Sequence, residues 1–236
     1  MIVLPVMTSL SRASNPTAAA LCLLCAVSYA VTGIAFFVDP SSQLRPGTPE
    51  YWAMLANAPL GRLVFLMAFA LAGITAFCAM PEIRRLIAPM NSLGRLAASL
   101  GQLGFGVTAI SYVRLIGGEA QRAQAFAAGS EDVRQSIASF SLSLDPQGWL
   151  IFFSSGLCLL IFGCVGWRAG TIPRAIAALG LICGLLYIVA FAARATQHML
   201  VVDIAAGLGA VVIGPIWWTS LALRFLTAPA QPSSIR

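Results

Sequence analysis

Six long apolar runs, separated by short polar segments, constrain this chain more than any other feature. They lie at about residues 17–38, 60–80, 95–117, 148–167, 173–193 and 199–226. Each run is long enough to cross about 30 Å of hydrocarbon as a helix. Backbone groups in lipid must be satisfied within helices or closed barrels, and these runs lack the alternation of barrel strands. The sequence therefore predicts an all-α membrane bundle of six transmembrane helices.

The composition agrees with one membrane domain at 1–226, followed by a flexible Pro- and Ser-rich tail at 227–236. Only 9% of the residues are charged and 59% are hydrophobic, whereas a soluble domain carries roughly a quarter charged residues. The first run continues through Phe36, Phe37 and Val38, beyond the usual core of a secretory signal. This length favours a retained helix over a cleaved signal.

Arginine placement predicts the orientation. If six helices alternate, eight arginines fall on the side of the termini and six on the other side. The loops 81–94 and 168–174 are short and basic, and short basic loops mark the cytoplasmic side. We therefore expect both termini to be cytoplasmic.

Glycine, proline and alanine mark turns and close helix contacts. Gly170 is placed to end the fourth helix in a left-handed conformation, and Pro173 to begin the fifth, so these two helices should be antiparallel neighbours. Small residues spaced four apart permit close helix packing. They predict contact faces at Gly180, Gly184, Ala206, Ala210 and Gly214.

Two longer segments, 39–59 and 118–147, lie on the side opposite the termini. Tyr51 and Trp52 in the first are suited to the membrane interface. The second contains apolar residues at helical spacing, which predicts a short amphipathic helix that lies on the membrane or covers the bundle. These residues are Val133, Ile137, Phe140 and Leu144.

Several kinds of chemistry are disfavoured by the residues available. The chain has no lysine for a Schiff base, and its one histidine, His198, cannot supply bis-histidine haem or a zinc site. Cys22 and Cys25 form a CxxC inside an apolar run, without a neighbour that would lower a thiol pKa. Scattered arginines argue against nucleic acid. We expect no catalytic residues, no metal and no cofactor, with bound lipid as the one candidate ligand.

Polar residues gather at one end of the predicted bundle, on the side opposite the termini. Asp203 lies about one turn inside its helix, where a charge usually faces a partner or a water-filled cavity. It is expected to pair with Arg194, Arg114 or Arg62. One hypothesis is a vestibule that binds an anionic or amphipathic ligand; the alternative is snorkelling arginines and one structural ion pair. The candidate ligand-binding residues are Arg62, Gln102, Arg114, Arg194, His198 and Asp203.

Four stretches resemble a bacterial membrane family known as domain of unknown function 4386. The similarity covers about residues 15–195 and implies a bundle of six or seven helices in a bacterial plasma (inner) membrane. It implies no activity and no catalytic residues. The stretches are NPTAAALCLLCAVSYAVTGIA (15–35), MLANAPLGRLVFLMAFAL (54–71), EIRRLIAPMNSLGRLAASLGQLG (82–104) and GWRAGTIPRAIAALGLICGLLY (166–187).

Three classes of function follow from these residues. The favoured one is a structural or accessory subunit, whose partners are membrane lipids and other membrane proteins or a second copy of the chain. The second is a small carrier or sensor of lipophilic or anionic molecules that uses the polar vestibule. The third, an intramembrane lipid-modifying enzyme, would rely on His198, Asp203 and Arg194 as acid–base residues.

Overall fold

The computed structural model describes residues 15–44, 47–57, 59–88, 91–139 and 143–227. Phe140 of the predicted amphipathic helix, and the predicted tail apart from Thr227, lie outside these residues. The described residues form helices and no strand. In chain order the helical elements are α1 (Pro16–Val38), η1 (Pro40–Gln43, a 3-10 helix), α2 (Pro49–Asn57), α3 (Pro59–Ile87), α4 (Ser92–Ala128), α5 (Glu131–Ser139), η2 (Trp149–Ser154, a π-helix), α6 (Ser155–Ala169), α7 (Arg174–Ala195), α8 (Met199–Gly207), η3 (Leu208–Ile213, a π-helix) and α9 (Gly214–Thr227).

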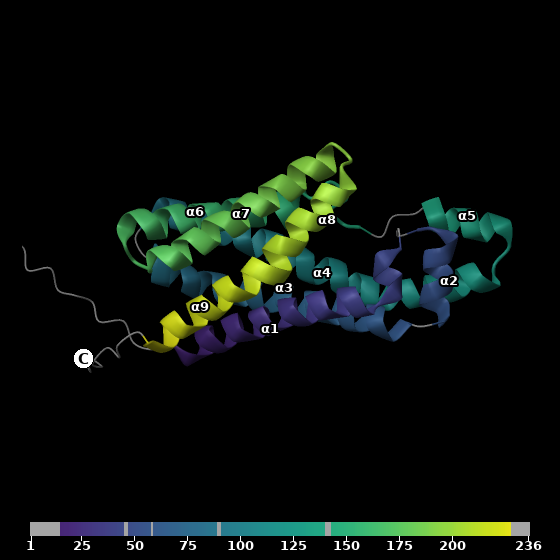
Figure 1. Cartoon of the computed structure of the whole chain (residues 1–236), viewed down its shortest axis with the longest axis horizontal. Helices are drawn as coiled ribbons and strands as arrows, with labels where there is room; N and C mark the ends of the chain where they lie inside the picture. Colours follow the sequence, from purple (N-terminus) through teal and green to yellow (C-terminus); the bar gives the residue numbers. More distant parts are fainter. Residues whose placement is uncertain (1–14, 45–46, 58, 89–90, 140–142, 228–236) are drawn as a thin grey trace, which may run out of the picture.

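Six helical spans in the described residues are long and apolar enough to cross a membrane, which confirms the predicted all-α bundle. Figure 1 shows them lying side by side along the long axis of the molecule. Exposed leucine, valine and isoleucine side chains cover their flanks. The spans are Pro16–Val38, Leu60–Ile87, Ser92–Ala128, Trp149–Ala169, Arg174–Ala195 and Met199–Thr227. The protein is therefore a multi-pass membrane protein.

Two helices are longer than the apolar runs from which they were predicted. The third span was predicted to end near residue 117, but α4 continues to Ala128 and is 37 residues long. At about 1.5 Å per residue it measures roughly 55 Å, well beyond the hydrocarbon thickness. α3 likewise continues past Pro81 to Ile87. The protruding part of α4 (118–128), α2 and α5 together form what we call the extension, which projects from one end of the bundle (Figure 1).

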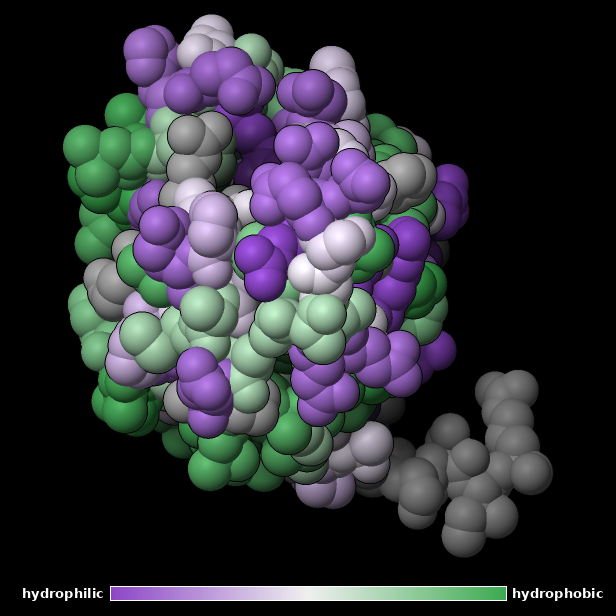
Figure 2. All heavy atoms as spheres, turned by 90° about the vertical axis from the view of Figure 1, so that its right-hand side faces the viewer, coloured by the Kyte–Doolittle hydropathy of each residue, from purple (hydrophilic) through white to green (hydrophobic). Residues whose placement is uncertain are grey.

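The extension has its own small core. Tyr51, Trp52 and Leu55 of α2 pack against Ala123 and Phe126 of α4. Tyr51 and Trp52 are therefore buried and are not interface aromatics as predicted. The short helix predicted in the following loop is present as α5, whose first turn carries two acidic residues. Hydrophilic side chains spread over this end of the molecule, and hydrophobic ones lie along its flanks (Figure 2).

Small residues set the distances between the spans. A Cβ at Gly184 would lie 2.8 Å from the carbonyl oxygen of Gly156, so this glycine lets α7 lie directly against α6. A Cβ at Gly180 would lie 3.0 Å from Nε1 of Trp217 in α9. Gly170 ends α6 with φ of 63°, as predicted, and the tight turn makes α6 and α7 antiparallel neighbours.

The last span is interrupted by η3. Pro215 has no N–H and cannot continue the usual ladder of helical hydrogen bonds. The N–H of Gly214 instead donates to the carbonyl of Gly209, five residues earlier, which is the π-helical pattern. α9 packs closely along α1, whereas α8 diverges from α1 towards the end that carries the extension (Figure 1). This divergence positions the candidate site.

Candidate ligand-binding cavity

A cavity of about 500 Å³ lies among the spans in the half of the bundle nearest the extension. Its walls come from α1, α3, α4, η2, α6, α7, α8 and η3. This volume falls within the range of about 300–1,000 Å³ that is usual for small-molecule sites. Sites of this kind are mostly apolar, with a few polar groups that orient the ligand.

Aromatic side chains dominate the walls. Nine of the residues that line the cavity are phenylalanine or tyrosine, in a chain with only 9% aromatic residues. Phe69 of α3 and Tyr112 of α4 stack with ring centroids 4.4 Å apart and planes 6° apart. Phe65 meets Phe69 edge-on at 5.1 Å. Deeper in the cavity, Tyr29 of α1 and Tyr187 of α7 contact each other.

Both π-helical segments contribute to this cavity. η2 supplies Ile151 and Phe152, and η3 supplies Val211 and its neighbours. A π-helical turn is rare and is frequent at functional sites. Two such turns from distant parts of the sequence therefore shape one cavity.

The cavity opens at a rim that carries two opposite charges. Arg194, at the end of α7, and Asp203, in α8, both line it. Nε of Arg194 donates to the carbonyl oxygen of Pro146 at 2.6 Å, which holds the guanidinium at the rim. Arg194 acts electrostatically on Asp203, but the two do not form a salt bridge within 4.0 Å. Neither charge is neutralised by close pairing with the other.

Apolar side chains at the opening face outward. Phe37 of α1 is 77% exposed, and Met199 and Ile204 of α8 are also exposed, yet all three line the cavity. α1 and α8 diverge here and meet again only at η3, where Val211 occupies the space left by Gly33. The cavity therefore has an apolar opening between α1 and α8.

A second charged cluster joins the extension to the bundle. Arg62 of α3 and Glu119 of α4 form a bidentate pair, with Nε to Oε2 at 2.8 Å and Nη2 to Oε1 at 2.9 Å. The hydroxyl of Tyr51 donates to the same carboxylate at 3.1 Å. The guanidinium also lies 4.9 Å from the ring centroid of Phe65, a cation–π contact. The guanidinium, the carboxylate and the phenol hydroxyl of this cluster each have a hydrogen-bond partner.

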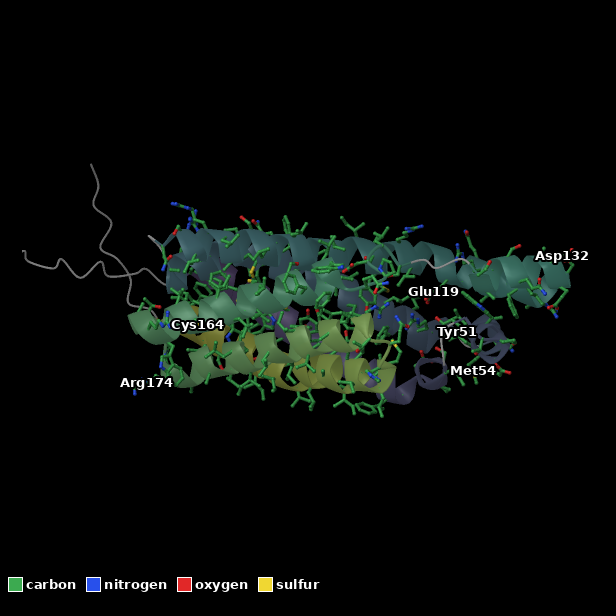
Figure 3. All side chains as sticks on the ribbon, turned by 90° about the horizontal axis from the view of Figure 1, so that it is seen from above. Tyr51, Met54, Glu119, Asp132, Cys164 and Arg174 are labelled. Carbon is green, nitrogen blue, oxygen red and sulfur yellow. The ribbon has the colours of Figure 1, made fainter. Side chains whose placement is uncertain are left out.

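Burial raises the pKa of the Tyr51 hydroxyl above its ordinary value, and the nearby Glu119 carboxylate acts in the same direction, while Arg62 opposes them. The phenol therefore stays neutral and remains a donor at physiological pH. Figure 3 places Tyr51 and Glu119 beside each other where the extension meets the bundle, with Asp132 at the tip and Arg174 at the opposite end.

Asp145 positions the segment that enters η2. Its carboxylate accepts hydrogen bonds from three backbone N–H groups, those of Trp149, Leu150 and Ile151, at 2.8–3.0 Å. These donors are otherwise unpaired in the first turn of a helix, and a negative charge is favoured there. Because Pro146 follows directly and accepts the hydrogen bond from Arg194, this carboxylate also supports the rim.

The structure brings together only part of the predicted binding set. Arg194 and Asp203 line the cavity, while Arg62 stands beside it and pairs with Glu119 rather than with Asp203. Arg114 and His198 are exposed and lie outside the lining, as does the half-buried Gln102.

Only some of the predicted packing residues lie at contacts between helices. Gly180 and Gly184 meet neighbouring helices, as described above. Ala206 and Ala210 line the cavity instead. A Cβ at Gly214 would lie 2.8 Å from the carbonyl oxygen of Gly209, so this glycine serves the π-helical turn of its own span.

Sequence reasoning missed the most unusual polar group of the cavity, Ser155. Ser155 lines the cavity, and its buried hydroxyl has no hydrogen-bond partner among the described residues. A serine within an apolar run gives no signal of this kind. No local pattern in the sequence points to the pairing of Glu119 with Arg62, which lies 57 residues away.

The two cysteines of the CxxC lie within the packed core. Cys25 donates to the carbonyl of Ala72 at 3.6 Å, and Cys22 is buried in the main core. Across the part of the chain that the structure describes, His, Cys, Asp and Glu never gather in groups of three.

Comparison with known proteins identifies the family. The family model described as domain of unknown function (DUF4386) matches residues 17–227. This chain belongs to the DUF4386 family. The match extends beyond residues 15–195, which carried the resemblance, and includes α8, η3 and α9. All residues that line the cavity therefore lie within the matched domain. No curated protein and no solved structure matched the chain.

Proposed function

We propose that this DUF4386 protein is a carrier or sensor that binds a lipophilic molecule with a polar or anionic group inside the membrane. The observation that carries the proposal is the aromatic cavity of about 500 Å³ with Arg194 and Asp203 at its rim. The apolar body of the ligand packs among the rings, and its polar group lies near the guanidinium of Arg194, which has donors left beyond its bond to Pro146.

Two features favour binding over the other classes of function. The candidate acid–base residues are not assembled: His198 is exposed outside the lining, while Asp203 is at the rim. A purely structural subunit has no use for a large cavity, because protein interiors pack closely and voids cost stability.

We further propose that the protein lies in a bacterial plasma (inner) membrane with both termini in the cytoplasm. The family resemblance and the apolar spans support a bacterial plasma (inner) membrane, and the basic short loops support cytoplasmic termini. Ala125 and Ala169 are exposed at opposite ends. In a background where the exposed Cys78 and Cys164 are alanine, an impermeant maleimide should label Ala125→Cys but not Ala169→Cys in intact cells. The reverse labelling would invert the orientation and leave the cavity assignment intact.

Gly207 provides the direct test of occupancy. It lines the cavity, and a Cβ there would meet nothing within 4 Å. Gly207→Phe should therefore place its ring in the cavity, from a position where the Cβ has room. Gly117 is a matched control, because it is also helical, also meets nothing within 4 Å, and does not line the cavity.

The experiment is extraction of both variants and the wild type in polymer nanodiscs, followed by mass spectrometry of everything that co-purifies. We expect one lipophilic compound in wild type and Gly117→Phe, and a loss of at least about ten-fold in Gly207→Phe, equivalent to about 1.4 kcal/mol. Equal retention in all three proteins contradicts the proposal. A stoichiometric protein partner, without an enriched compound, supports the accessory-subunit class instead.

A further inference from the structure

The hydroxyl of Ser155 differs from every neighbouring hydroxyl in the floor of the cavity. Ser155 is 1% exposed, and its Oγ has no hydrogen-bond partner among the described residues. In contrast, Thr32 and Thr108 line the same cavity but donate to the carbonyls of Ser28 and Gly104, each at 2.9 Å. A buried hydroxyl without a partner costs free energy, so such groups are rare and call for an explanation.

The local packing gives this hydroxyl its space. A Cβ at Gly104 of α4 would lie 2.2 Å from Oγ of Ser155, so only glycine leaves room for it. The next residue, Gly156, packs against Gly184 and Ile188 of α7. Gly184 and Ile188 precede Arg194 in α7 by ten and six residues. Ser155, which is next to Gly156, therefore lies roughly 10–15 Å deeper in the bundle than the rim.

The walls between this floor and the rim favour a flat ring. Phe69 and Tyr112 stack, and Phe65 meets Phe69 edge-on, so faces and edges of rings line the space. Aromatic rings attract one another in such offset and edge-to-face arrangements beyond the area that they bury. An aliphatic chain gains only from the area that it buries here, whereas a planar ring also gains these ring–ring contacts.

We propose that the ligand is a quinone-class lipid: a planar ring with oxygen acceptors and an attached apolar chain. Oγ of Ser155 donates to the ring oxygen at the floor, the ring packs among the aromatic walls, and the chain leaves through the apolar opening between α1 and α8. This inference rests on the proposed binding function and narrows it to one chemical class. It concerns binding alone and requires no electron transfer.

Ser154 supplies a matched control for the test. It precedes Ser155, is 3% exposed, and its hydroxyl already donates to the carbonyl of Leu150. The variants Ser155→Ala and Ser154→Ala thus each remove one buried hydroxyl from adjacent positions. Only Ser155 lines the cavity.

The probes are a naphthoquinone with a short alkyl chain and the matching alkylnaphthalene, which lacks the ring oxygens. Binding to nanodisc-embedded protein is measured by equilibrium dialysis, with empty nanodiscs as the blank. We expect the quinone to bind roughly ten-fold more tightly than the naphthalene in wild type and Ser154→Ala. In Ser155→Ala the ratio should fall to about two-fold or less, because one donor is lost.

Thermal unfolding without probe separates this role from a structural one. Ser155→Ala should match or exceed the unfolding temperature of wild type, since it removes an unsatisfied group. An unchanged probe ratio in Ser155→Ala overturns the assignment, and so does an equal affinity of both probes for the wild type. If Gly207→Phe still loses its co-purifying compound in that case, the cavity remains a binding site and only the quinone class is rejected.

Discussion

Two clusters of charge lie near the same end of the molecule, and they differ in how far their groups are satisfied. In the first, Arg62 and Glu119 form a bidentate pair, and Tyr51 adds a third hydrogen bond. In the second, Arg194 and Asp203 share a cavity rim without a salt bridge between them. Residue type and position along the bundle are similar in both.

The difference assigns different roles to similar residues. Buried charges with complete partners hold secondary structures in one arrangement, and removing one partner leaves the other uncompensated. Charged groups with donors left over, and hydroxyls without internal partners, can form hydrogen bonds with a bound molecule. The Arg62 cluster therefore joins the extension to the bundle, while the Arg194 rim and Ser155 are available to a ligand.

The largest effect is expected from breaking the satisfied cluster. Arg62→Ala leaves Glu119 buried without its counter-charge, and should lower the free energy of unfolding by about 3–5 kcal/mol. The measurement is thermal or denaturant unfolding in a mild detergent. Arg85→Ala is the control, because Arg85 pairs with Glu82 while being 65% exposed; it should cost less than about 1 kcal/mol. Equal effects of the two changes would remove the contrast between the clusters.

A smaller loss is expected at Asp145, which connects the two roles. Asp145→Ala removes the acceptor of three backbone N–H groups and should cost about 2 kcal/mol. It should also loosen the segment whose Pro146 carbonyl holds Arg194. Retention of the co-purifying compound should therefore fall together with stability. Lower stability with full retention would show that the rim does not depend on this segment.

Substitutions at the rim should change ligand retention while leaving the free energy of unfolding almost unchanged. Arg194→Ala and Asp203→Ala should each change the free energy of unfolding by within about 0.5 kcal/mol, as is usual for incompletely buried residues. We expect Arg194→Ala to lower ligand retention several-fold. If unfolding and retention are unchanged in both variants, these residues only snorkel towards water.

A modest loss of stability is expected at Tyr51. Tyr51→Phe removes one hydrogen bond to Glu119 and should cost about 1 kcal/mol at pH 8. Because burial raises the pKa of this phenol above 10.0, the folded protein keeps a proton that the unfolded chain releases. That stability is complete below about pH 10 and is lost as the pH rises towards the folded-state pKa. The variant should lose less stability than the wild type between pH 8 and pH 11; parallel losses would argue against this titration.

The sequence predicted what hydropathy can encode. Six apolar runs gave six spans, and Gly170 gave the end of α6, because lipid imposes length and helicity on every crossing segment.

The extension, apart from α5, was missed because it contains little hydrophobic signal. Residues 118–128 contain five alanines, two glutamines and one arginine, which favour helix while adding little to hydropathy. Tyr51 and Trp52 were read as interface aromatics, since only the extra turns of α4 provide the surface that buries them.

The cavity could not be predicted from the same patterns. Phenylalanine in a membrane span contributes equally to hydropathy whether it faces lipid, core or cavity. The sequence therefore did not distinguish Phe65 and Phe69, which line the cavity, from other phenylalanines. The partner of Arg62 depends on the relative height and rotation of α3 and α4, which single-helix patterns do not encode.

The length of α4 makes it a lever arm. One continuous helix lines the cavity at Thr108 and ends about 30 Å further on at Ala128. Because its residues between these points contain no break, a tilt of about 5° at the cavity moves the far end by roughly 2.6 Å by simple geometry over that length. A spectroscopic reporter at the exposed Ala125 would thus amplify any adjustment of the aromatic walls.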